Sequence, residues 1–411
     1  MTSNRISRAT ECRVCESSEL YTFLELGEMP PANAFVESPD VEERRFPLDV
    51  VVCQSCDHVQ LQYTVDRELL FTDYPYFSSA SDPLNEHFGA YAAQLESRFL
   101  DPGDFVLEIG SNDGVLLSQL GDDLERLGVD PAENVSEEAR ERGVETITAF
   151  FDDEVAAEVH ETRGPAEAIV ANNVVGHVDD LHGLMRGIDR LLAPEGVFVL
   201  EVPYLVDLLN GMEFDTIYHE HISYFSIRAL TRLVEQFGME VFDVERRDIH
   251  GGSIRAFVQR QSADRSVATI VSALTRLELA TGLDDEATYD DFAARVERFR
   301  TRLTRLLDGL KADGATIVGY GAPAKGNVLL NFCDVSTETL DFLIDTTPAK
   351  QYTYSPVTNI PVRPPDAFHE ARPDYALLLA WNYRDAILDK ETSFRERGGR
   401  FVLPIPNLDV V

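Results

Sequence analysis

Phe105-Val-Leu-Glu-Ile-Gly-Ser-Asn-Asp-Gly-Val-Leu-Leu117 is the stretch of sequence that decides the fold. An apolar run ends in the carboxylate of Glu108, and Gly110 and Gly114 then enclose a small polar set before a second apolar pattern begins. This order predicts a strand, a tight turn and the start of a helix, because the glycines let a ligand approach the backbone closely. We therefore expect an α/β fold with a ligand site at this turn.

The turn fits a methyl donor better than a dinucleotide. The dinucleotide fingerprint G-x-G-x-x-G is not met, because Asn112 occupies the place of its second glycine. The order Glu-x-Gly-x-x-x-Gly resembles motif I of the S-adenosylmethionine-dependent methyltransferases with a Rossmann-like fold. Asp130 falls where the next strand should end, and a carboxylate there suits a pair of ribose hydroxyls. An unrelated α/β turn is the alternative. The candidate cofactor-binding residues of this region are Glu108, Gly110, Asn112, Gly114 and Asp130.

Length and charge limit the possible functions. A chain of 411 residues is too long for one small core and predicts two or three domains. It carries 72 acidic and 36 basic residues, a formal net charge of −36, which argues against nucleic acid as a partner. Excess acid with only four lysines resembles a halophilic adaptation to a high-salt cytoplasm. The sequence has no run of membrane-spanning length and no apolar signal segment, so we expect a cytoplasmic protein without a membrane partner.

Four of the five cysteines form two C-x-x-C pairs, Cys12 with Cys15 and Cys53 with Cys56. Each pair can place two thiolates on one metal, and two pairs complete a closed tetrahedral zinc site. A closed site is structural, because it leaves no position for a substrate. Two disulfides or two redox pairs are the alternatives, and a cytosolic setting favours zinc. We expect a zinc-binding domain over residues 1–70 that depends on its metal.

Residues 71–245 carry the alternating pattern of a doubly wound sheet, the expected methyltransferase domain. The predicted strands are 105–109, 126–130, 145–150, 168–173 and 197–202. Ligands bind beyond the carboxyl ends of such strands. Phe151 follows the third strand and could bracket an adenine ring, and Asn173 and His177 follow the fourth. A lone histidine there is as often a packed residue as a catalyst.

Tyr76 and Ser79, before the first strand, could line a mouth over a polar substrate or form a plain packed loop.

Ile217-Tyr218-His219-Glu220-His221-Ile-Ser223-Tyr224-Phe225 holds the densest group of titratable side chains. Imidazole suits proton abstraction near neutrality, an adjacent carboxylate can orient it, and a phenol can donate to a developing oxyanion. A second metal site and a packing cluster are the alternatives. We favour a catalytic cluster, in view of the expected methyl donor.

The remaining sequence predicts a connector and a second α/β domain. Over residues 246–310 a Gly-Gly-Ser turn leads to a strand with Arg255, followed by two long amphipathic helices. The turn and Arg255 would suit phosphate oxygens, and an ordinary hairpin is the alternative. Residues 311–411 again combine a strand with a Gly-rich turn and predict a smaller Rossmann-like domain. Lys325 in this turn would suit a nucleoside diphosphate, whereas the degenerate fingerprint does not indicate NAD.

Six motifs together resemble the deoxysugar-nucleotide C-methyltransferases of the tetronitrose and mycarose type. They are the four-cysteine module, Glu108-x-Gly-x-Asn-x-Gly114, Asn-Asn-Val-x-Gly-His177, Tyr218-His-Glu-His221-x-Ser-Tyr-Phe225, His-Gly-Gly-Ser253-x-Arg255 and Gly-Tyr-Gly-Ala-x-Ala-Lys325-Gly. The resemblance implies a zinc domain, an S-adenosylmethionine domain and a C-terminal Rossmann-like domain that binds a sugar nucleotide. It implies as substrate a nucleotide-linked 4-keto sugar, carried on dTDP or a similar nucleotide and methylated at C3. It also implies His221 as catalytic base, with Tyr218, Glu220 and His177 in the acid/base network.

Three other functions fit parts of the sequence. An O- or N-methyltransferase acting on another small molecule needs less of a carbon base. A zinc-ribbon RNA methyltransferase is disfavoured by the net charge. A non-catalytic nucleotide-sugar binding protein would keep the donor turn as a relic.

Overall fold

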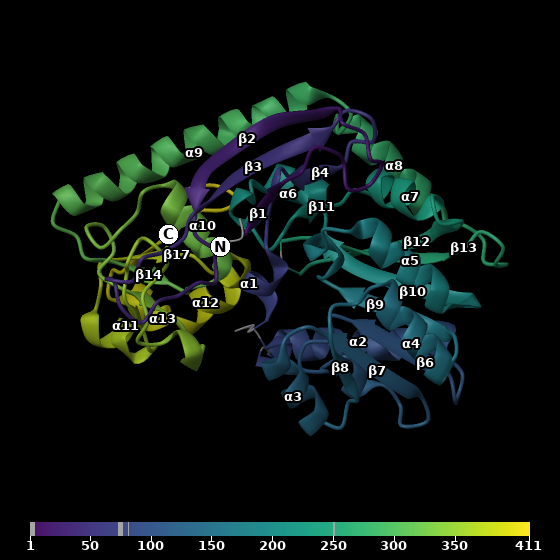
Figure 1. Ribbon diagram of the computed structural model, residues 1–411. Coiled ribbons are helices and arrows are strands. Elements are labelled where there is room, and N and C mark those ends of the chain that lie inside the picture. Colours follow the sequence, from purple (N-terminus) through teal and green to yellow (C-terminus); the bar gives the residue numbers. More distant parts are fainter. Residues whose placement is uncertain (1–4, 73–76, 81, 250) are drawn as a thin grey trace.

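A seven-stranded sheet in the order β12-β13-β10-β9-β6-β7-β8 forms the core of the middle part of the chain, on the right in Figure 1, and is called the central sheet. This computed structural model describes residues 5–72, 77–80, 82–249 and 251–411. The strands β6 to β10 are parallel, whereas β13 is antiparallel to both of its neighbours. The strands are β6 (Phe105–Ile109), β7 (Glu125–Asp130), β8 (Thr146–Thr148), β9 (Ala166–Asn172), β10 (Leu192–Pro203), β12 (Met239–Arg247) and β13 (Ser253–Arg260). All five strands predicted for the parallel part are confirmed.

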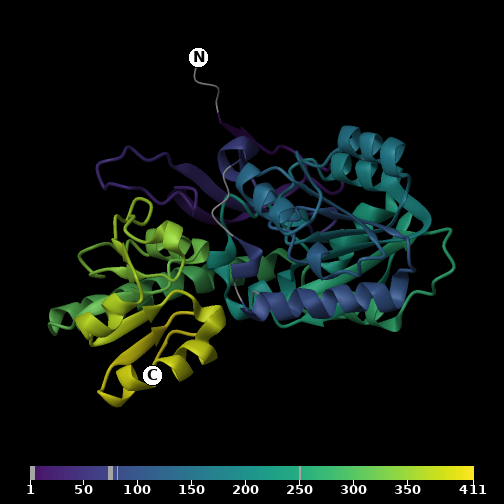
Figure 2. The ribbon, with the colours of Figure 1, turned by 90° about the horizontal axis from the view of Figure 1, so that it is seen from below.

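Helices cover both faces of this sheet, which explains why every residue of β6 is buried. The helix α2 packs against one face, where Tyr91 and Leu95 share a core with Val106 and Phe257 (Figure 2). The other face packs against α5 and α7. The helices of this domain are α2 (Asp82–Phe99), α3 (Glu133–Glu141), α4 (Asp153–Arg163), α5 (Leu181–Leu191), α6 (Leu205–Gly211) and α7 (Ile227–Glu235).

Two sequence predictions about this domain are wrong. The helix expected after the Gly110 turn is a single 3-10 turn, η2 (Leu117–Gln119), because Gly121-Asp-Asp follows at once and ends the apolar pattern. The connector was expected to begin at residue 246, but the end of β12 and all of β13, up to Arg260, belong to the central sheet. The apolar run within β13 is buried and pairs with β10, which gives the domain its antiparallel strand.

The N-terminal module, residues 5–72, shares a sheet with a distant part of the chain. Its four-stranded sheet has the order β11-β4-β3-β2, and β11 (Ser223–Tyr224) comes from the predicted catalytic segment. The elements of the module itself are β1 (Ile6–Arg8), β2 (Leu20–Met29), β3 (Phe46–Cys53), β4 (Val59–Leu61), β5 (Tyr63–Val65) and α1 (Arg67–Phe71). The module is therefore built into the central domain.

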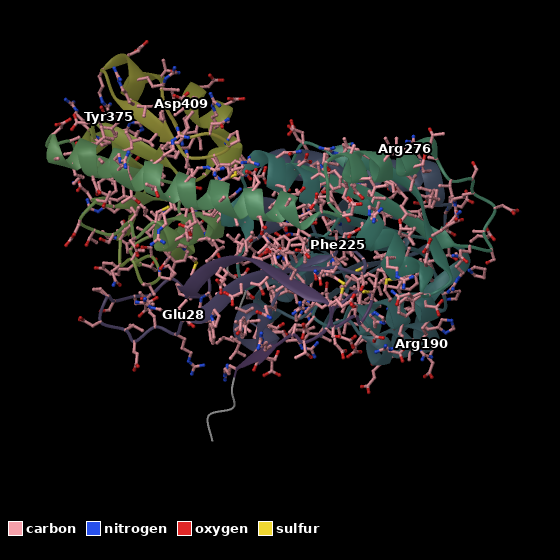
Figure 3. The ribbon with its side chains drawn as sticks, turned by 90° about the horizontal axis from the view of Figure 1, so that it is seen from above. Glu28, Arg190, Phe225, Arg276, Tyr375 and Asp409 are labelled. Carbon is pink, nitrogen blue, oxygen red and sulfur yellow. The ribbon has the colours of Figure 1, made fainter. Side chains whose placement is uncertain are left out.

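Both long helices predicted between the α/β domains are present, as α8 (Thr269–Ala280) and α9 (Glu286–Ala312). Figures 1 and 3 show α9 running alongside β2 toward the C-terminal domain. The Tyr289 ring of α9 packs against Phe23 of β2 with centroids 4.9 Å apart. Farther along α9, Phe299 packs against Phe214 at 5.3 Å. The helix α9 thus contributes to the core that joins the domains.

The C-terminal domain, residues 315–411, is a six-stranded sheet in the order β16-β15-β14-β17-β18-β19. Its strands are β14 (Ile317–Tyr320), β15 (Leu343–Ile344), β16 (Val362–Arg363), β17 (Tyr375–Leu378), β18 (Arg400–Leu403) and β19 (Asp409–Val410). Its helices are α10 (Ala324–Phe332), α11 (Asp366–Ala371), α12 (Arg384–Lys390) and α13 (Thr392–Glu396). Across the described part of the chain, every helix is too short or too polar to cross a lipid bilayer.

Candidate active site and metal centre

The turn after β6, residues 110–114, is the expected methyl-donor site and is called the donor turn. It has the backbone shape that its glycines predict. Gly110 has a φ of +66° and Gly114 a φ of +72°, both in the left-handed region that disfavours a side chain. A β-carbon at Gly110 would lie 2.2 Å from Cγ2 of Val174, which follows β9. The amide of Asn112 donates to Oδ2 of Asp130 at 2.9 Å. The turn therefore lies close to the ends of β7 and β9.

We expect Gly110→Ala to weaken S-adenosylmethionine binding about 10- to 100-fold, since the new methyl group must displace Val174 and the donor turn. Gly103→Ala is the matched control. Gly103 also has a positive φ, of +95°, but no atom lies within 4 Å of the position of its β-carbon. The Gly103→Ala variant should lose about 1 kcal/mol of unfolding free energy and keep the affinity of the wild type for S-adenosylmethionine. Calorimetry with S-adenosylmethionine measures both variants, and equal affinities would contradict the assignment of Gly110.

Buried polar atoms at this turn fit a polar ligand. Oε1 of Glu108 accepts a hydrogen bond from Nδ2 of Asn172 at 3.2 Å. Within the described residues, Oε2 of Glu108, Oδ1 of Asn172 and Oγ of Ser111 are buried without a hydrogen-bond partner. Burial raises the pKa of Glu108 well above its usual range, and it also raises the pKa of Asp130. Such buried groups require polar partners, and the hydroxyl and amino groups of S-adenosylmethionine can supply them.

Residues 77–80 close over the donor turn. The amide of Ser78 donates to Oδ1 of Asn112 at 2.9 Å, and the amide of Ser79 donates to Oδ2 of Asp113 at 3.2 Å. The Ser79 hydroxyl accepts a hydrogen bond from Arg142 at 2.6 Å. Ser79 thus borders the donor turn, as expected for the mouth of a site. Tyr76, the other residue predicted there, lies outside the described residues.

The two residues predicted after the third and fourth strands lie at the same end of the sheet. The half-buried Phe151 packs against Gly187 of α5, where a β-carbon would lie 2.9 Å from Cε1 of the ring. Asn173 has a φ of +55°, and its amide donates to the Glu201 carbonyl at 2.8 Å. Asn173 also lines a pocket beyond the carboxyl ends of β9 and β10.

This open pocket contains both predicted catalytic histidines. Its lining residues are Asn173, Gly176, His177, Val202, Pro203, Thr216, His221, Ser223 and Tyr224. The rings of His177 and His221 stack with centroids 4.9 Å apart. Phe71 of the N-terminal module stacks on His177 at 5.6 Å, and Tyr218 lies 4.0 Å from His221. Four rings from three distant segments therefore meet beside the end of the central sheet.

A hydrogen bond fixes one proton of the His221 ring, and burial determines the protonation state of His177. Nδ1 of His221 lies 2.8 Å from the carbonyl oxygen of Thr216. A carbonyl only accepts, so Nδ1 carries a proton, and in the neutral form of the ring the lone pair is then on Nε2. Burial lowers the pKa of His177 to about 4, so that ring is neutral at physiological pH. The histidine pair can therefore provide a base and a neutral hydrogen-bond donor.

Two groups in this pocket were given no role of their own by the sequence, although Tyr224 belongs to the predicted cluster. The Thr216 carbonyl was missed because a backbone group has no signature in the sequence. The phenol of Tyr224 is buried and has no hydrogen-bond partner among the described residues.

Glu220, expected to orient the base, accepts hydrogen bonds from Nδ2 of Asn33 on both carboxylate oxygens, at 2.9 and 3.0 Å. In this structure a carbonyl orients the ring of His221, and Glu220 binds the N-terminal module.

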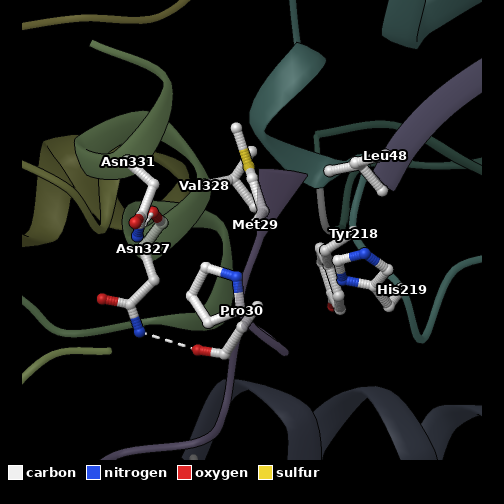
Figure 4. Close-up of a pocket in the computed structure, with 9 residues that line it drawn as sticks. Met29, Pro30, Leu48, Tyr218, His219, Asn327, Val328 and Asn331 are labelled. Carbon is white, nitrogen blue, oxygen red and sulfur yellow. Dashed lines mark hydrogen bonds between the residues drawn. The ribbon is translucent and has the colours of Figure 1, made fainter. Parts of the chain in front are cut away.

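His219 occupies a different environment from His221. Figure 4 shows its ring beside Tyr218 and Leu48, in a small pocket that Met29 and Pro30 also line. Its Nε2 lies 3.3 Å from the Phe46 carbonyl, which fixes the proton on that nitrogen. The side chain is 1% exposed, and burial lowers its pKa from 6.5 to about 4. His219 is therefore a packed residue of the core.

We expect His219→Gln to reduce the acid sensitivity of the fold. Between pH 6.5 and pH 4 the unfolded chain binds a proton at His219 that the folded chain does not bind, so stability falls as the pH is lowered. Glutamine does not titrate. The loss of unfolding free energy between pH 7 and pH 5 should be about 2 kcal/mol smaller in the variant. Urea unfolding at constant ionic strength measures it, with the exposed His160→Gln as control. An unchanged pH dependence would contradict the prediction.

The four paired cysteines converge as zinc ligands do. Their Sγ atoms all lie within 4.8 Å of one another, with Cys12 to Cys56 at 3.6 Å and Cys15 to Cys53 at 3.5 Å. Four sulfurs bound 2.3 Å from a tetrahedral zinc lie about 3.8 Å apart, whereas a disulfide requires about 2.05 Å. The disulfide alternative is therefore wrong, and the donor set fits zinc. Cys333 is buried elsewhere as a free thiol.

The assignment of Arg255 to a diphosphate is wrong. Its side chain is 2% exposed, and it forms an ion pair with Glu201 at 2.8 Å. It also donates to Gln94 at 2.7 Å, and its guanidinium lies 3.4 Å from the centroid of Tyr91. The adjoining Gly252 faces the carboxylate of Asp207, so the turn is an ordinary hairpin end. Arg255 joins α2, β10 and β13 inside the protein, where the hydrogen bonds of its guanidinium are already used.

Lys325 lies at the junction of the central and C-terminal domains. Its Nζ is 4.0 Å from the centroid of Trp381. Burial lowers its pKa, although the charges of Asp215 and Glu213 oppose that shift. Nε1 of Trp381 donates to Oδ2 of Asp215 at 2.7 Å. Burial and the charge of Asp215 raise the pKa of Glu213 to about 8. Lys325 is thus a partly buried cation in a polar junction.

Comparison with known families divides the chain into three matched regions. Residues 12–71 match a family described as "Putative zinc binding domain", residues 84–244 match "Methyltransferase domain", and residues 248–406 match "C-methyltransferase C-terminal domain". The C-methyltransferase NovU of Streptomyces niveus is 41% identical over 407 residues, which cover 98% of this chain and 96% of that protein.

Two solved methyltransferase structures each resemble less than half of the chain. Magnesium protoporphyrin IX methyltransferase from Synechocystis, with bound S-adenosylmethionine, has a TM-score of 0.33 and 14% identity, covering 43% of this chain and 79% of that one. The N-methyltransferase NodS from Bradyrhizobium japonicum has a TM-score of 0.34 and 13% identity, covering 44% of this chain and 98% of that one.

Proposed function

Because the chain belongs to the C-methyltransferase family, with S-adenosylmethionine as methyl donor and zinc at its four cysteines, we propose that it methylates C3 of a nucleotide-linked 4-keto deoxysugar. One observation carries this proposal. The imidazole of His221 lies in a pocket at the carboxyl ends of β9 and β10, and the Thr216 carbonyl holds its proton on Nδ1. A basic Nε2 at the carboxyl ends of the parallel strands, where the donor turn also lies, suits the removal of a proton from carbon.

The chemistry assigns a task to each residue of the pocket. The 4-keto group makes the C3 proton acidic, and Nε2 of His221 removes it. The resulting enolate places negative charge on the 4-oxygen, where neutral His177 or the Tyr218 phenol donates a hydrogen bond. S-adenosylmethionine, when bound, supplies an electrophilic methyl group for the enolate carbon. Glu220 positions the segment that carries His221, through its hydrogen bonds to Asn33.

The substrate nucleotide is proposed to bind between the domains. Lys325 is one of four lysines in a chain with 72 acidic residues, and it lies at the junction of the central and C-terminal domains. The carboxylates of Asp215 and Glu213 act on this ammonium, but neither forms an ion pair with it within 4.0 Å in the described part of the chain, and a diphosphate would supply a direct charged partner. The donor side would hold S-adenosylmethionine through Glu108, the glycine turn and Asp130, with Ser79 at the mouth.

Proton exchange tests the proposed reaction directly. A dTDP-4-keto-6-deoxysugar is incubated in heavy water with the enzyme and S-adenosylhomocysteine, and deuterium at C3 is followed by NMR. We expect exchange in the wild type and methylation at C3 when S-adenosylmethionine replaces the product analogue. O- or N-methylation would transfer the methyl group without C3 exchange. A binding protein would take up the sugar nucleotide with neither reaction, and either result would overturn the proposal.

A further inference from the structure

Arg13 links the metal centre to the histidine pocket. It lies between two metal ligands in the sequence, and its side chain is 4% exposed. Nε donates to Oδ1 of Asp179 at 2.8 Å, Nη1 donates to the Leu61 carbonyl at 2.8 Å, and Nη2 donates to Oγ1 of Thr64 at 2.6 Å. Thr64 donates in turn to Oδ1 of Asp179 at 3.0 Å. Each nitrogen of this buried guanidinium therefore has a partner, and one partner lies outside the module.

That outside partner belongs to the loop that carries His177. Asp179 follows the 3-10 turn η3 (Val175–His177) by two residues and precedes α5. Just after this loop, in the first turn of α5, Nε2 of His182 lies 3.0 Å from the Val14 carbonyl, within the same metal-binding knuckle. The knuckle thus binds the chain at two points that follow His177, one at Asp179 within the loop and one at His182 in the first turn of α5, and a change in its shape moves both attachments.

The second histidine is tied to the same module. The amide of Ile222, next to His221, donates to the Gly176 carbonyl at 2.8 Å, and the amide of Leu61 donates to the Ile222 carbonyl at 2.9 Å. Leu61 is also the residue whose carbonyl binds Arg13. A chain of hydrogen bonds therefore runs from the knuckle through β4 to both histidine segments.

We propose that Arg13 is a positioning residue, through which the zinc knuckle sets the relative placement of His177 and His221. Its effect on catalysis rests on the function proposed above. A buried, multiply bonded guanidinium has one well-defined position, and the metal defines that position by closing the loop between Cys12 and Cys15. The zinc site would then belong to the active site indirectly, besides its contribution to folding.

The chain offers a matched control for this pairing. Asp57 follows the ligand Cys56, and its Oδ2 accepts a hydrogen bond from Nε of Arg228 at 3.1 Å. Like Arg13, this pair connects a metal-binding knuckle to the central domain. Arg228 belongs to α7 and is not among the residues that line the histidine pocket. Arg228→Lys therefore disturbs a comparable attachment without reaching the loop of His177.

The test compares Arg13→Lys with Arg228→Lys in the zinc-loaded full chain. Lysine keeps the charge but loses the fork that joins Asp179 to Leu61 and Thr64. We expect Arg13→Lys to keep its zinc and its affinity for S-adenosylmethionine, and to lower kcat for sugar methylation about 10- to 100-fold. KM for the sugar should change less than kcat. In ¹³C-histidine spectra, the His177 signal, assigned with His177→Gln, should shift in this variant and stay in place in Arg228→Lys.

The possible results separate the two proposals. Unchanged kcat and an unchanged His177 signal in Arg13→Lys would overturn the positioning role, and so would equal effects in both variants. If Arg13→Lys loses zinc, Asp179→Asn, which leaves the knuckle intact, replaces it with the same expectations. If the wild type does not methylate the sugar, the proposed function fails, and the His177 signal then decides the positioning role on its own.

Discussion

His221→Ala should lower kcat for methylation at C3 by about 100- to 10,000-fold, the usual contribution of a general base. The variant should also lose exchange of the C3 proton in heavy water. Binding of S-adenosylmethionine should remain, because the donor turn follows β6 and Asp130 ends β7, whereas His221 belongs to the segment before β11. Stopped-flow or discontinuous methylation assays measure kcat, and calorimetry measures donor affinity.

His219→Gln is the control for this experiment. It changes an imidazole only two residues away that is packed in the core against the Phe46 carbonyl. Its turnover per folded enzyme should stay within a few-fold of the wild type. If His221→Ala kept full exchange, or if His219→Gln lost as much turnover, the base would have to be assigned to another residue, with His177 as the next candidate in the same pocket.

Cys56→Ser should lose the metal and unfold the N-terminal module, the largest expected effect on stability. Structural zinc contributes on the order of 10 kcal/mol of apparent binding free energy in small domains, and a hydroxyl is a poor replacement for a thiolate. The damage should extend beyond residues 5–72, because β11 pairs with β4 of the module. Zinc content falls from one per chain to nearly none, and limited proteolysis should cut the module and the segment around His221.

Cys333→Ala serves as the matched cysteine control. Cys333 is 1% exposed in the core and does not belong to the four-sulfur cluster. This variant should keep its zinc and lose about 1 kcal/mol of stability from the small cavity. A Cys56→Ser protein that is free of zinc, resists protease and turns over like the wild type would contradict a structural role for the metal.

Patterns within single elements were sufficient to predict the shape of the turn after β6 and the clustering of the four cysteines. The strand and turn at Glu108 to Gly114, the acid at Asp130 and the two C-x-x-C pairs occupy the places expected from the sequence. Each depends on residues within a few positions of one another, where hydrophobic period, glycine geometry and ligand spacing act directly. The helix expected after the turn failed because Gly121 ends a pattern that is too short for a helix.

Long-range packing decided the rest. The guanidinium of Arg255 has the chemistry of a phosphate ligand. The register of β10 and β13 places Glu201 opposite Arg255, however, and both side chains are buried. Only the fold adds β11 to the module's sheet, and only the fold aims the Thr216 carbonyl at His221 and Arg13 at Asp179. The sequence by itself thus determined the domain types, the glycine turn after β6 and the four-cysteine cluster. The tertiary structure decided which groups contact the histidine segments, because those partners lie up to 187 residues apart and meet only when the domains pack.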